Sequence, residues 1–200
     1  MSTTAPGLRE RKKARTRAAI VRATLELTLE HGFAAATIPQ IAERADVAPR
    51  TVSLYFPHKE EIVFDGAAES VDRLVAHLTG GSGDLVEGLR AWLADEATRT
   101  TDDALELLRH RAVVADRDLR MRDRQLMEAA EEKIASVVAD ELSEPLTGIG
   151  PRTFATAMVS VLTAVRDVYV STHDSAAAEQ ELERGLAFLQ AGLDALRRTG

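Results

Sequence analysis

Four side chains that can hydrogen bond to a nucleic-acid base or phosphate lie close together in the sequence: Arg50, Thr51, Ser53 and Tyr55. Arginine can donate two hydrogen bonds to one guanine, and a Ser or Thr hydroxyl can bond either a base or a phosphate. A helix over this stretch would turn Val52 and Phe56 to another side, where they can pack in a core. The stretch therefore predicts a short helix with one apolar side and one side that carries hydrogen-bonding groups.

A second short helix is predicted immediately before this one. The Thr37 hydroxyl can accept a hydrogen bond from a backbone N–H of the next turn, and Pro39 fits the first turn, where its missing N–H costs nothing. The apolar residues that follow have helical spacing: Ile38, Ile41, Ala42 and Ala45. Asp46 tolerates a left-handed turn, and Val47 can pack inward from it. Two helices around so short a turn form a helix-turn-helix, whose second helix enters the major groove of DNA.

Charge is distributed unevenly along the chain. The net charge is −7, yet residues 1–60 carry ten Lys or Arg against six acidic residues, and the remainder carries fifteen against twenty-six. The basic end is therefore the end with the predicted helix-turn-helix, as DNA binding requires. The charged run from Arg9 to Arg17 is either the solvated start of a helix or an arm that faces phosphates. We favour the arm, because the run leads directly into the apolar stripe of a first helix. The predicted phosphate contacts are Arg17, Thr37 and Lys59.

The segment from Arg17 to Val63 resembles the DNA-binding region of the TetR family of bacterial transcriptional regulators. The resemblance rests on His31–Gly32–Phe33, Ala36–Thr37–Ile38, Ile41–Ala42 with Ala45, Val47, Arg50–Thr51–Val52, and Tyr55–Phe56–Pro57 with Lys59. Three positions depart from the family pattern: Asp46 stands for a usual Gly, Ser53 for an aromatic residue and Thr28 for a Phe. The resemblance implies an all-α fold of about nine helices, with a three-helix N-terminal DNA-binding domain before a larger helical domain for ligand binding and dimerisation.

The same resemblance implies a homodimeric repressor that binds a palindromic double-stranded DNA operator and is released by a small-molecule effector. The alternative is an architectural protein that coats DNA without sequence preference, which the acidic body of the chain disfavours. An enzyme is less favoured still. The five histidines are scattered, no glycine-rich phosphate loop follows a strand, and no nucleophile motif is present. We therefore expect no catalytic residue, no metal and no cofactor.

Composition limits the remaining classes of protein. Apolar residues make up 45% of the 200 residues, and there is no Cys for a disulfide or a thiolate metal site. No apolar run approaches the roughly 20 residues that cross a bilayer, and the start MSTTAPG lacks the apolar core of a signal peptide. We expect a cytoplasmic protein with no membrane partner.

The chain beyond the helix-turn-helix reads as helical throughout, and no stretch alternates with period two for long enough to form a strand. A single helix from about Lys59 to Leu78 is expected to connect the DNA-binding domain, residues 1–58, to the effector-binding and dimerisation domain, residues 59–200. Asp84 is expected to cap the helix that follows.

A ligand pocket in this larger domain would be lined by the bulky or polar residues of its otherwise aliphatic helices: Trp92, His110, Met127, Phe154, Arg166 and Tyr169. For most of them ordinary core is the favoured interpretation, since methionine for example is a common gap-filler. His110 and Arg166 are the better candidates, because a cation among apolar positions needs a partner, either an internal acid or an anionic ligand.

The last helix, predicted from Ala176 to Arg198, carries leucines at steps of four, three, four and three, which is a heptad pattern. Two glycines seven residues apart lie beside this seam and would permit close helix approach. The pattern fits either a terminal helix packed on its own core or a dimer interface. TetR-like proteins dimerise through their last two helices as a four-helix bundle, and the resemblance therefore favours an interface that includes Leu182, Gly185, Leu186, Leu189, Gly192 and Leu193.

Overall fold

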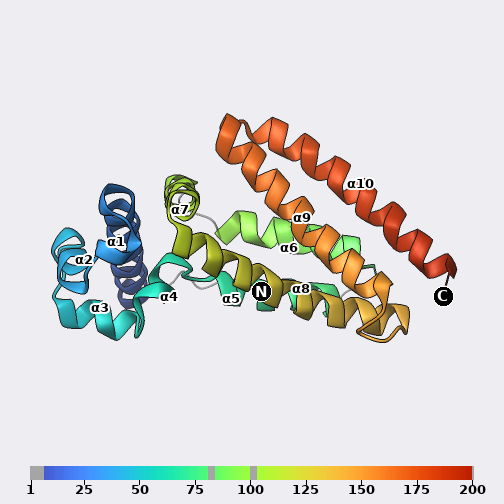
Figure 1. The fold of residues 1–200 in the computed structure, drawn as a ribbon, viewed down its shortest axis with the longest axis horizontal. Coiled ribbons are helices and arrows are strands. Elements are labelled where there is room, and N and C mark those ends of the chain that lie inside the picture. The colour runs from blue at the N-terminus through green and yellow to red at the C-terminus, as the bar shows by residue number, and fades with distance from the viewer. Residues whose placement is uncertain (1–6, 81–83, 100–102, 200) are drawn as a thin grey trace. The chain divides into compact units, whose positions relative to one another are not determined.

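A computed structural model describes residues 7–80, 84–99 and 103–199 of the chain. Within these residues the fold is entirely helical, with ten α-helices and one 3-10 helix (Figure 1), and this confirms the predicted all-α class. The chain divides into two compact units, and each is described by itself. Among the described residues, the first unit holds 7–66 and 103–123, and the second holds 67–80, 84–99 and 124–199.

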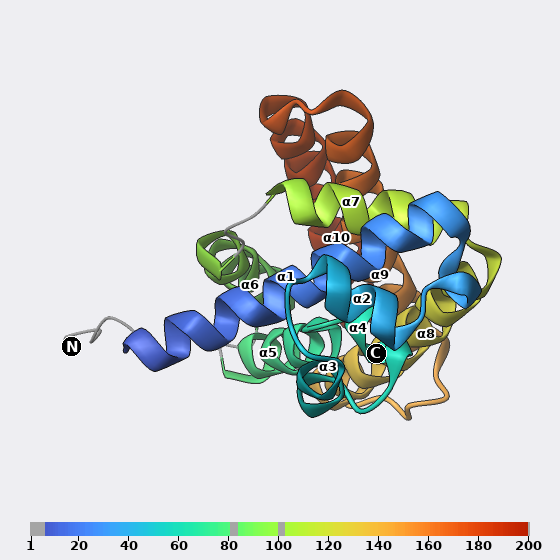
Figure 2. The ribbon, with the colours of Figure 1, turned by 90° about the vertical axis from the view of Figure 1, so that its left-hand side faces the viewer.

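The first unit is built around α1, which Figure 2 shows along its length. Its core includes Ile20, Leu25, Ile41, Val52 and Phe56, each at most 2% exposed. The α7 helix packs against α1 and adds Ala112 to the same core. The elements of this unit are α1 (Leu8–His31), η1 (Phe33–Ala35), α2 (Ile38–Arg44), α3 (Pro49–Tyr55), α4 (Lys59–Val63), α7 (Asp103–Ala115) and the start of α8 (Arg117–Leu142).

Two buried threonines on α1 satisfy their hydroxyl groups within the helix itself. Thr24 donates to the carbonyl oxygen of Ile20 at 2.9 Å, and Thr28 donates to that of Thr24 at 2.8 Å. Thr28 is 2% exposed, so it occupies the core at a position where the family pattern has a Phe. A smaller polar residue is tolerated there because its one donor has an acceptor four residues earlier.

The helix-turn-helix corner forms as the sequence predicts. Thr37 caps α2, and its backbone N–H also donates to the side chain of Gln40 at 3.0 Å, which completes a capping box. Asp46 ends the helix in the left-handed conformation with φ 53°. The N–H of Val47 donates to the carbonyl oxygen of Ala42 at 2.9 Å, the bond that a left-handed residue after a helix permits.

The predicted single helix from Lys59 to Leu78 is wrong. The structure has α4 and then α5 (Ala67–Gly80), with a break in which Gly66 has φ +82°. The chain turns here because Asp65 is held from two sides: its carboxylate accepts from Arg17 Nε at 2.8 Å, and its carbonyl oxygen accepts from Arg109 Nη1 at 3.0 Å. This break accounts for ten helices where nine were expected.

The turn after α1 is tied to the start of α8 by a single carboxylate. Asp116 accepts from the N–H of Phe33 at 2.9 Å, and from the N–H groups of Asp118 and Leu119 at 3.0 and 3.1 Å. Burial raises the pKa of Asp116, but these three backbone donors and the charge of Arg120 lower it further than burial raises it, so the net shift is downward. The ionised carboxylate therefore stabilises this junction.

The second unit packs its helices around a separate core. That core includes Leu89, Ile134, Met158, Leu189 and Leu193, all at most 1% exposed. Asp84 caps α6, as predicted, by accepting from the N–H of Val86 at 2.9 Å. The elements of this unit are α5, α6 (Leu85–Arg99), the remainder of α8, α9 (Ile149–Thr172) and α10 (Ser175–Thr199).

Glycines allow close helix contacts at two points of this unit. A Cβ on Gly88 of α6 would lie 2.8 Å from the carbonyl oxygen of His77 on α5. A Cβ on Gly185 of α10 would lie 2.4 Å from a methyl group of Val161 on α9, and Figure 1 shows these two helices side by side. Gly185 thus serves close packing within its own chain. Gly192 differs, because a Cβ there would meet no atom within 4 Å.

The α9 helix is strongly apolar, although only a small part of it is buried. By length and composition it could cross a membrane, since one 18-residue window has a mean hydropathy of 1.3, yet only 22% of that window is buried. Long apolar helices of water-soluble proteins pass the same test when other helices cover them. The apolar residues of α9 outside the core are mostly half-buried, as Val161, Leu162 and Val165 are.

We predict that Asp116→Asn lowers the free energy of unfolding by about 1–2 kcal/mol at neutral pH, because one of the acceptors that hold three backbone donors is replaced. Since the folded-state pKa of Asp116 is lowered, the stabilisation is present above the ordinary Asp pKa of about 3.9 and is lost as pH falls through the folded value. Urea denaturation at one protein concentration, at neutral and acidic pH, measures both effects.

The matched control is Glu128→Gln, which replaces an exposed acid on α8, the helix that begins directly after Asp116. It should leave the free energy of unfolding within about 0.5 kcal/mol at either pH. A difference between wild type and Asp116→Asn that stays constant as the pH falls would contradict the role given to the ionised carboxylate.

Candidate nucleic-acid interface

The α3 helix has one buried side and one exposed side. Val52 is fully buried and Phe56, just past the helix end, is 2% exposed, and both lie in the first core. Arg50, Ser53 and Leu54 are exposed, and their spacing of three and four residues places them on one helix face. The helix therefore presents a guanidinium, a hydroxyl and an apolar side chain together to solvent.

Thr51 and Tyr55 flank this face and are half-buried, with Tyr55 packed against the first core. The four side chains expected to meet DNA are thus not equally exposed. Arg50 and Ser53 are exposed, whereas Thr51 and Tyr55 are half-buried. The DNA contacts of all four remain predictions, and the geometry favours Arg50 and Ser53 for base contacts.

The predicted phosphate contacts have partners inside the unit. The Arg17 guanidinium donates from Nε to both carboxylate oxygens of Asp65, at 2.8 and 2.9 Å, and lies 4.5 Å from the centre of the Phe56 ring. Lys59 Nζ donates to the carbonyl oxygen of Phe33 at 2.8 Å and lies 4.3 Å from the centre of the Phe33 ring. Both cations therefore help to hold α3 and α4 in place, whatever they contribute to DNA binding.

Arg44 at the end of α2 is similarly engaged. It pairs with Glu30 of α1, with one N–O distance of 2.5 Å and a second of 2.8 Å, and this hydrogen bond lowers the pKa of the Glu30 carboxyl. Within the part of the chain that the structure describes, no such partner is seen for Arg50. Arg50 is the cation of the helix-turn-helix that is best placed to bind an external group.

The first two turns of α1 form an exposed basic arm. Residues 8–15 are helical and solvent-exposed, and they contain five cations against the single acid Glu10. A helix that carries so many like charges without a covering partner is suited to a polyanion. The run from Arg9 is thus a helical extension of α1 rather than an irregular tail.

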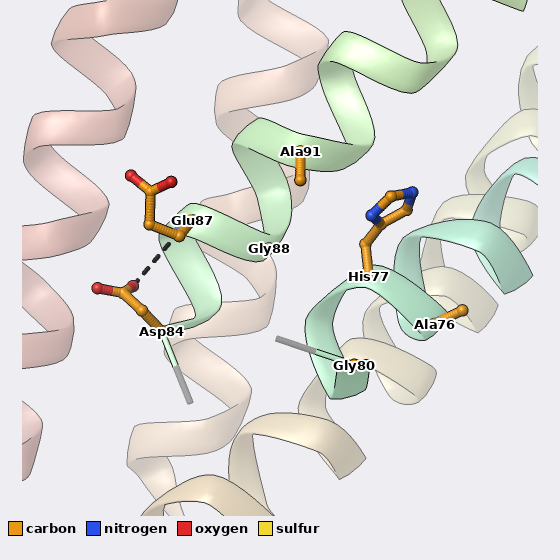
Figure 3. Close-up of a pocket in the computed structure, with 7 residues that line it drawn as sticks. All are labelled: Ala76, His77, Gly80, Asp84, Glu87, Gly88 and Ala91. Atoms are coloured by element: carbon orange, nitrogen blue, oxygen red, sulfur yellow. Dashed lines mark hydrogen bonds between the residues drawn. The ribbon is translucent and has the colours of Figure 1, made fainter. Parts of the chain in front are cut away.

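The six residues predicted to line a ligand pocket are not gathered at either of two surface hollows of the structure. One hollow, of about 500 Å³, lies between α5 and α6 beside His77, Asp84 and Gly88 (Figure 3). The other, of about 420 Å³, lies in the first unit beside Lys59 and Leu119. Among the described residues no group of three or more His, Asp or Glu side chains is arranged to hold a metal ion.

Several of the six residues have places in the protein interior. Phe154 is 3% exposed in the second core, and Met127 and Trp92 pack against it. The Trp92 indole also donates to the carbonyl oxygen of Ser70 at 3.2 Å. The Arg166 side chain is 46% exposed, with its Nε 3.8 Å from Asp167 on the same helix. His110 lies in the first unit and Tyr169 on α9, and both are half-buried.

The heptad leucines of α10 belong to the protomer's own core. Leu186, Leu189 and Leu193 are 2%, 1% and 0% exposed, so their side chains have almost no surface left for a partner. Leu182 is half-buried against the same core. A different face of α10 is open to solvent: Phe188 is 65% exposed, and Ala191, Gly192 and Ala195 follow it at helical spacing.

Sequence reasoning overlooked Leu54 and Phe188, two exposed apolar residues. Their positions in the helix could have revealed them. Each is adjacent in sequence to a residue of the buried side, and adjacent residues of a helix point in different directions. It also overlooked Asp65 and Asp116, whose partners lie 48 and 83 residues away. Nothing local in the sequence marks such distant pairs.

A helix-turn-helix whose second helix exposes an arginine, together with an exposed basic arm on α1, is typical of a DNA-binding protein. The sequence pattern described as "Bacterial regulatory proteins, tetR family" matches residues 20–65, and the pattern described as "MftR C-terminal domain" matches residues 83–194. The second match alone covers more than half of the chain. The chain belongs to the TetR family of bacterial transcriptional regulators.

Similar proteins agree with this membership. The HTH-type transcriptional regulator TcmR of Streptomyces glaucescens is 49% identical over 57 residues, which are 28% of this chain and 25% of TcmR. The uncharacterised HTH-type transcriptional regulator YdeS of Bacillus subtilis is 38% identical over 68 residues, 34% of each chain. The chain thus matches only about a quarter of TcmR and about a third of YdeS.

Solved structures share the fold over most of the chain. The SmeT–triclosan complex superposes with a TM-score of 0.64 at 18% identity and covers 88% of this chain and 90% of SmeT. NalD of Pseudomonas aeruginosa, the secondary repressor of the MexAB-OprM multidrug efflux pump, gives a TM-score of 0.60 at 18% identity, with 91% and 97% covered. At such identities the likeness establishes the fold alone.

We predict that Arg50→Ala weakens binding to a cognate DNA site by about 1–3 kcal/mol, the usual cost of removing a bidentate contact to guanine. A gel-shift or fluorescence titration against a site selected from random DNA measures the loss. The control Arg184→Ala removes an equally charged side chain that is 71% exposed on α10, and it should bind as the wild type does. Equal affinities for wild type and Arg50→Ala would exclude Arg50 from base contact.

Proposed function

We propose that this chain is a homodimeric repressor that binds a palindromic DNA operator through α3 and is released by a small-molecule effector bound in its helical body. The observation that carries the proposal is the exposed face of α3, where Arg50 and Ser53 point away from the core that Val52 and Phe56 anchor. A recognition helix requires this division, because base edges can be read only by side chains that do not hold the helix in place.

The charge distribution supports DNA as the partner. The basic arm of α1 and Arg50 lie in a region of net positive charge, while the rest of the chain is strongly acidic. An acidic body would repel DNA if it approached from that side. The proposal therefore assigns phosphate binding to the arm and to Arg17, Thr37 and Lys59, and base contacts to Arg50, Thr51, Ser53 and Tyr55.

The surfaces of the last two helices support a dimer. Only 22% of the apolar window of α9 is buried, with Val161, Leu162 and Val165 half-buried, and α10 displays Phe188 beside small residues. An aromatic side chain among small neighbours lets a second helix approach closely and fill the space around the ring. The proposed interface is the exposed face of α10 that carries Phe188, and of the six residues predicted for the interface only Gly192 lies on this face. Leu182, Gly185, Leu186, Leu189 and Leu193 then support it from within the protomer.

Effector release is supported by the family and by two solved relatives. SmeT has been solved in complex with triclosan, and FadR of Thermus thermophilus, 24% identical with a TM-score of 0.54, in complex with lauroyl-CoA. Within the second unit the polar candidates for ligand contact are Arg166 and Tyr169, because Phe154 lies in the core and Met127 and Trp92 pack against it, while His110 belongs to the first unit. In this proposal the protein acts in the cytoplasm by binding DNA and an effector, and it catalyses no reaction.

The function is tested by selection of binding sites from a random duplex pool with the purified full chain. We expect a palindromic consensus whose half-site centres lie about 34–36 Å apart or a multiple of that spacing. We also expect the selected duplex to bind at least about 1,000-fold more tightly than unrelated DNA. Equal binding to unrelated duplexes would instead support a DNA-coating architectural protein and would contradict the repressor proposal.

The dimer is tested with Phe188→Glu. Placing a carboxylate at the centre of an apolar interface should raise the dimer dissociation constant about tenfold or more, because the charge would have to be buried without a partner. Analytical ultracentrifugation over a range of concentrations measures this constant. Leu146→Glu, at a residue that is 51% exposed in the loop before α9, is the control and should remain dimeric. A dimer unaffected by Phe188→Glu would contradict the proposed interface.

A further inference from the structure

Leu54 is conspicuous on the exposed face of α3. Its side chain is 80% exposed, although leucine is among the residues most often buried. It lies four residues after Arg50 and directly after Ser53, so it shares the face from which base contacts are proposed. The α3 helix does not depend on it, because Val52 and Phe56 supply the burial that holds the helix against the core.

We propose that Leu54 reads a thymine in each operator half-site through the C5-methyl group of that base. This inference rests on the proposed function, since it requires α3 to lie in the major groove. It adds an apolar contact, and so a base preference, to a face otherwise assigned to hydrogen bonding.

The chemistry of the groove leaves few partners for a leucine. The side chain has no donor or acceptor, and pressing it against a phosphate or a polar base edge would remove water without replacing its hydrogen bonds. The thymine methyl group is the apolar feature of the major-groove edges, and apolar side chains contact it in known complexes. Leu54 therefore gains free energy against a T·A pair and loses it against a pair that presents polar atoms.

The contact of Leu54 would add a base preference that the neighbouring residues do not supply. A Ser53 hydroxyl can serve either a base or a phosphate, so alone it specifies little. Arg50 favours guanine, and Leu54, one turn further along the same face, would then specify a thymine near that guanine. The two side chains have opposite chemistry and would read two different base pairs.

The test uses a double-mutant cycle on the operator selected with the wild-type chain. Each thymine of one half-site is replaced in turn by deoxyuridine, which lacks only the C5-methyl group. For the wild type we expect a loss of about fourfold in affinity at one position, the value of one buried methyl group. Leu54→Ala should show a similar loss on the intact operator and no further loss when deoxyuridine stands at that position.

Leu146→Ala is the matched control, because it makes the same substitution at a leucine that is 51% exposed in the loop before α9, in the second unit. It should respond to deoxyuridine as the wild type does. Because Leu54 is so exposed, Leu54→Ala should keep the fold, and its circular dichroism and unfolding midpoint check this.

The possible outcomes separate the two proposals. A palindromic consensus whose thymine methyl groups have no effect, or affect Leu54→Ala and the wild type equally, overturns the Leu54 proposal alone. A consensus without a T·A pair in its half-sites does the same. Failure to obtain any consensus overturns the proposed function, and the Leu54 proposal with it.

Discussion

The burial of one side of α3 is the constraint on which the proposed function depends. A helix of seven residues is too short to be stable alone in water, so it forms because Val52 and Phe56 are buried in the first core. Full burial of two such side chains contributes roughly 1.5–3 kcal/mol each. The same packing decides which residues face outward, and it leaves Arg50, Ser53 and Leu54 together in solvent. Stability and recognition are thus assigned to opposite sides of one short helix.

The surrounding polar contacts hold this helix in its place. Arg17 bonds to Asp65 and stacks on Phe56, Lys59 bonds to the carbonyl oxygen of Phe33, and Asp116 accepts three backbone N–H groups. Apart from the Asp116 bonds to Asp118 and Leu119, each contact joins segments far apart in the sequence. Several cations of the basic end are therefore structural, and they cannot be counted as DNA contacts on charge alone. The exposed arm of α1 and Arg50 are the cations that remain suited to an external anion.

Local features of the fold were predictable because their causes are local. A Thr three residues before a Gln predicts a capped helix, an Asp after a helix predicts a left-handed turn, and Asp84 predicts a cap. The break between α4 and α5 was not predictable, because the partners of Asp65 on α1 and α7 lie 48 and 44 residues away. Periodicity also found the buried side of α10 without showing what buries it. Leu186, Leu189 and Leu193 meet their own protomer, and the open side around Phe188 carries the interface proposal.

The most direct measurement is a structure of the full chain bound to its selected operator. Repressor action through α3 predicts two protomers related by a two-fold axis, with both α3 helices in major grooves on one side of the duplex. Arg50, Ser53 and Leu54 should then lie within contact distance of base edges, and the basic arms should lie along phosphates. A complex in which DNA lies against another surface, with the exposed face of α3 still in solvent, would contradict DNA recognition through α3.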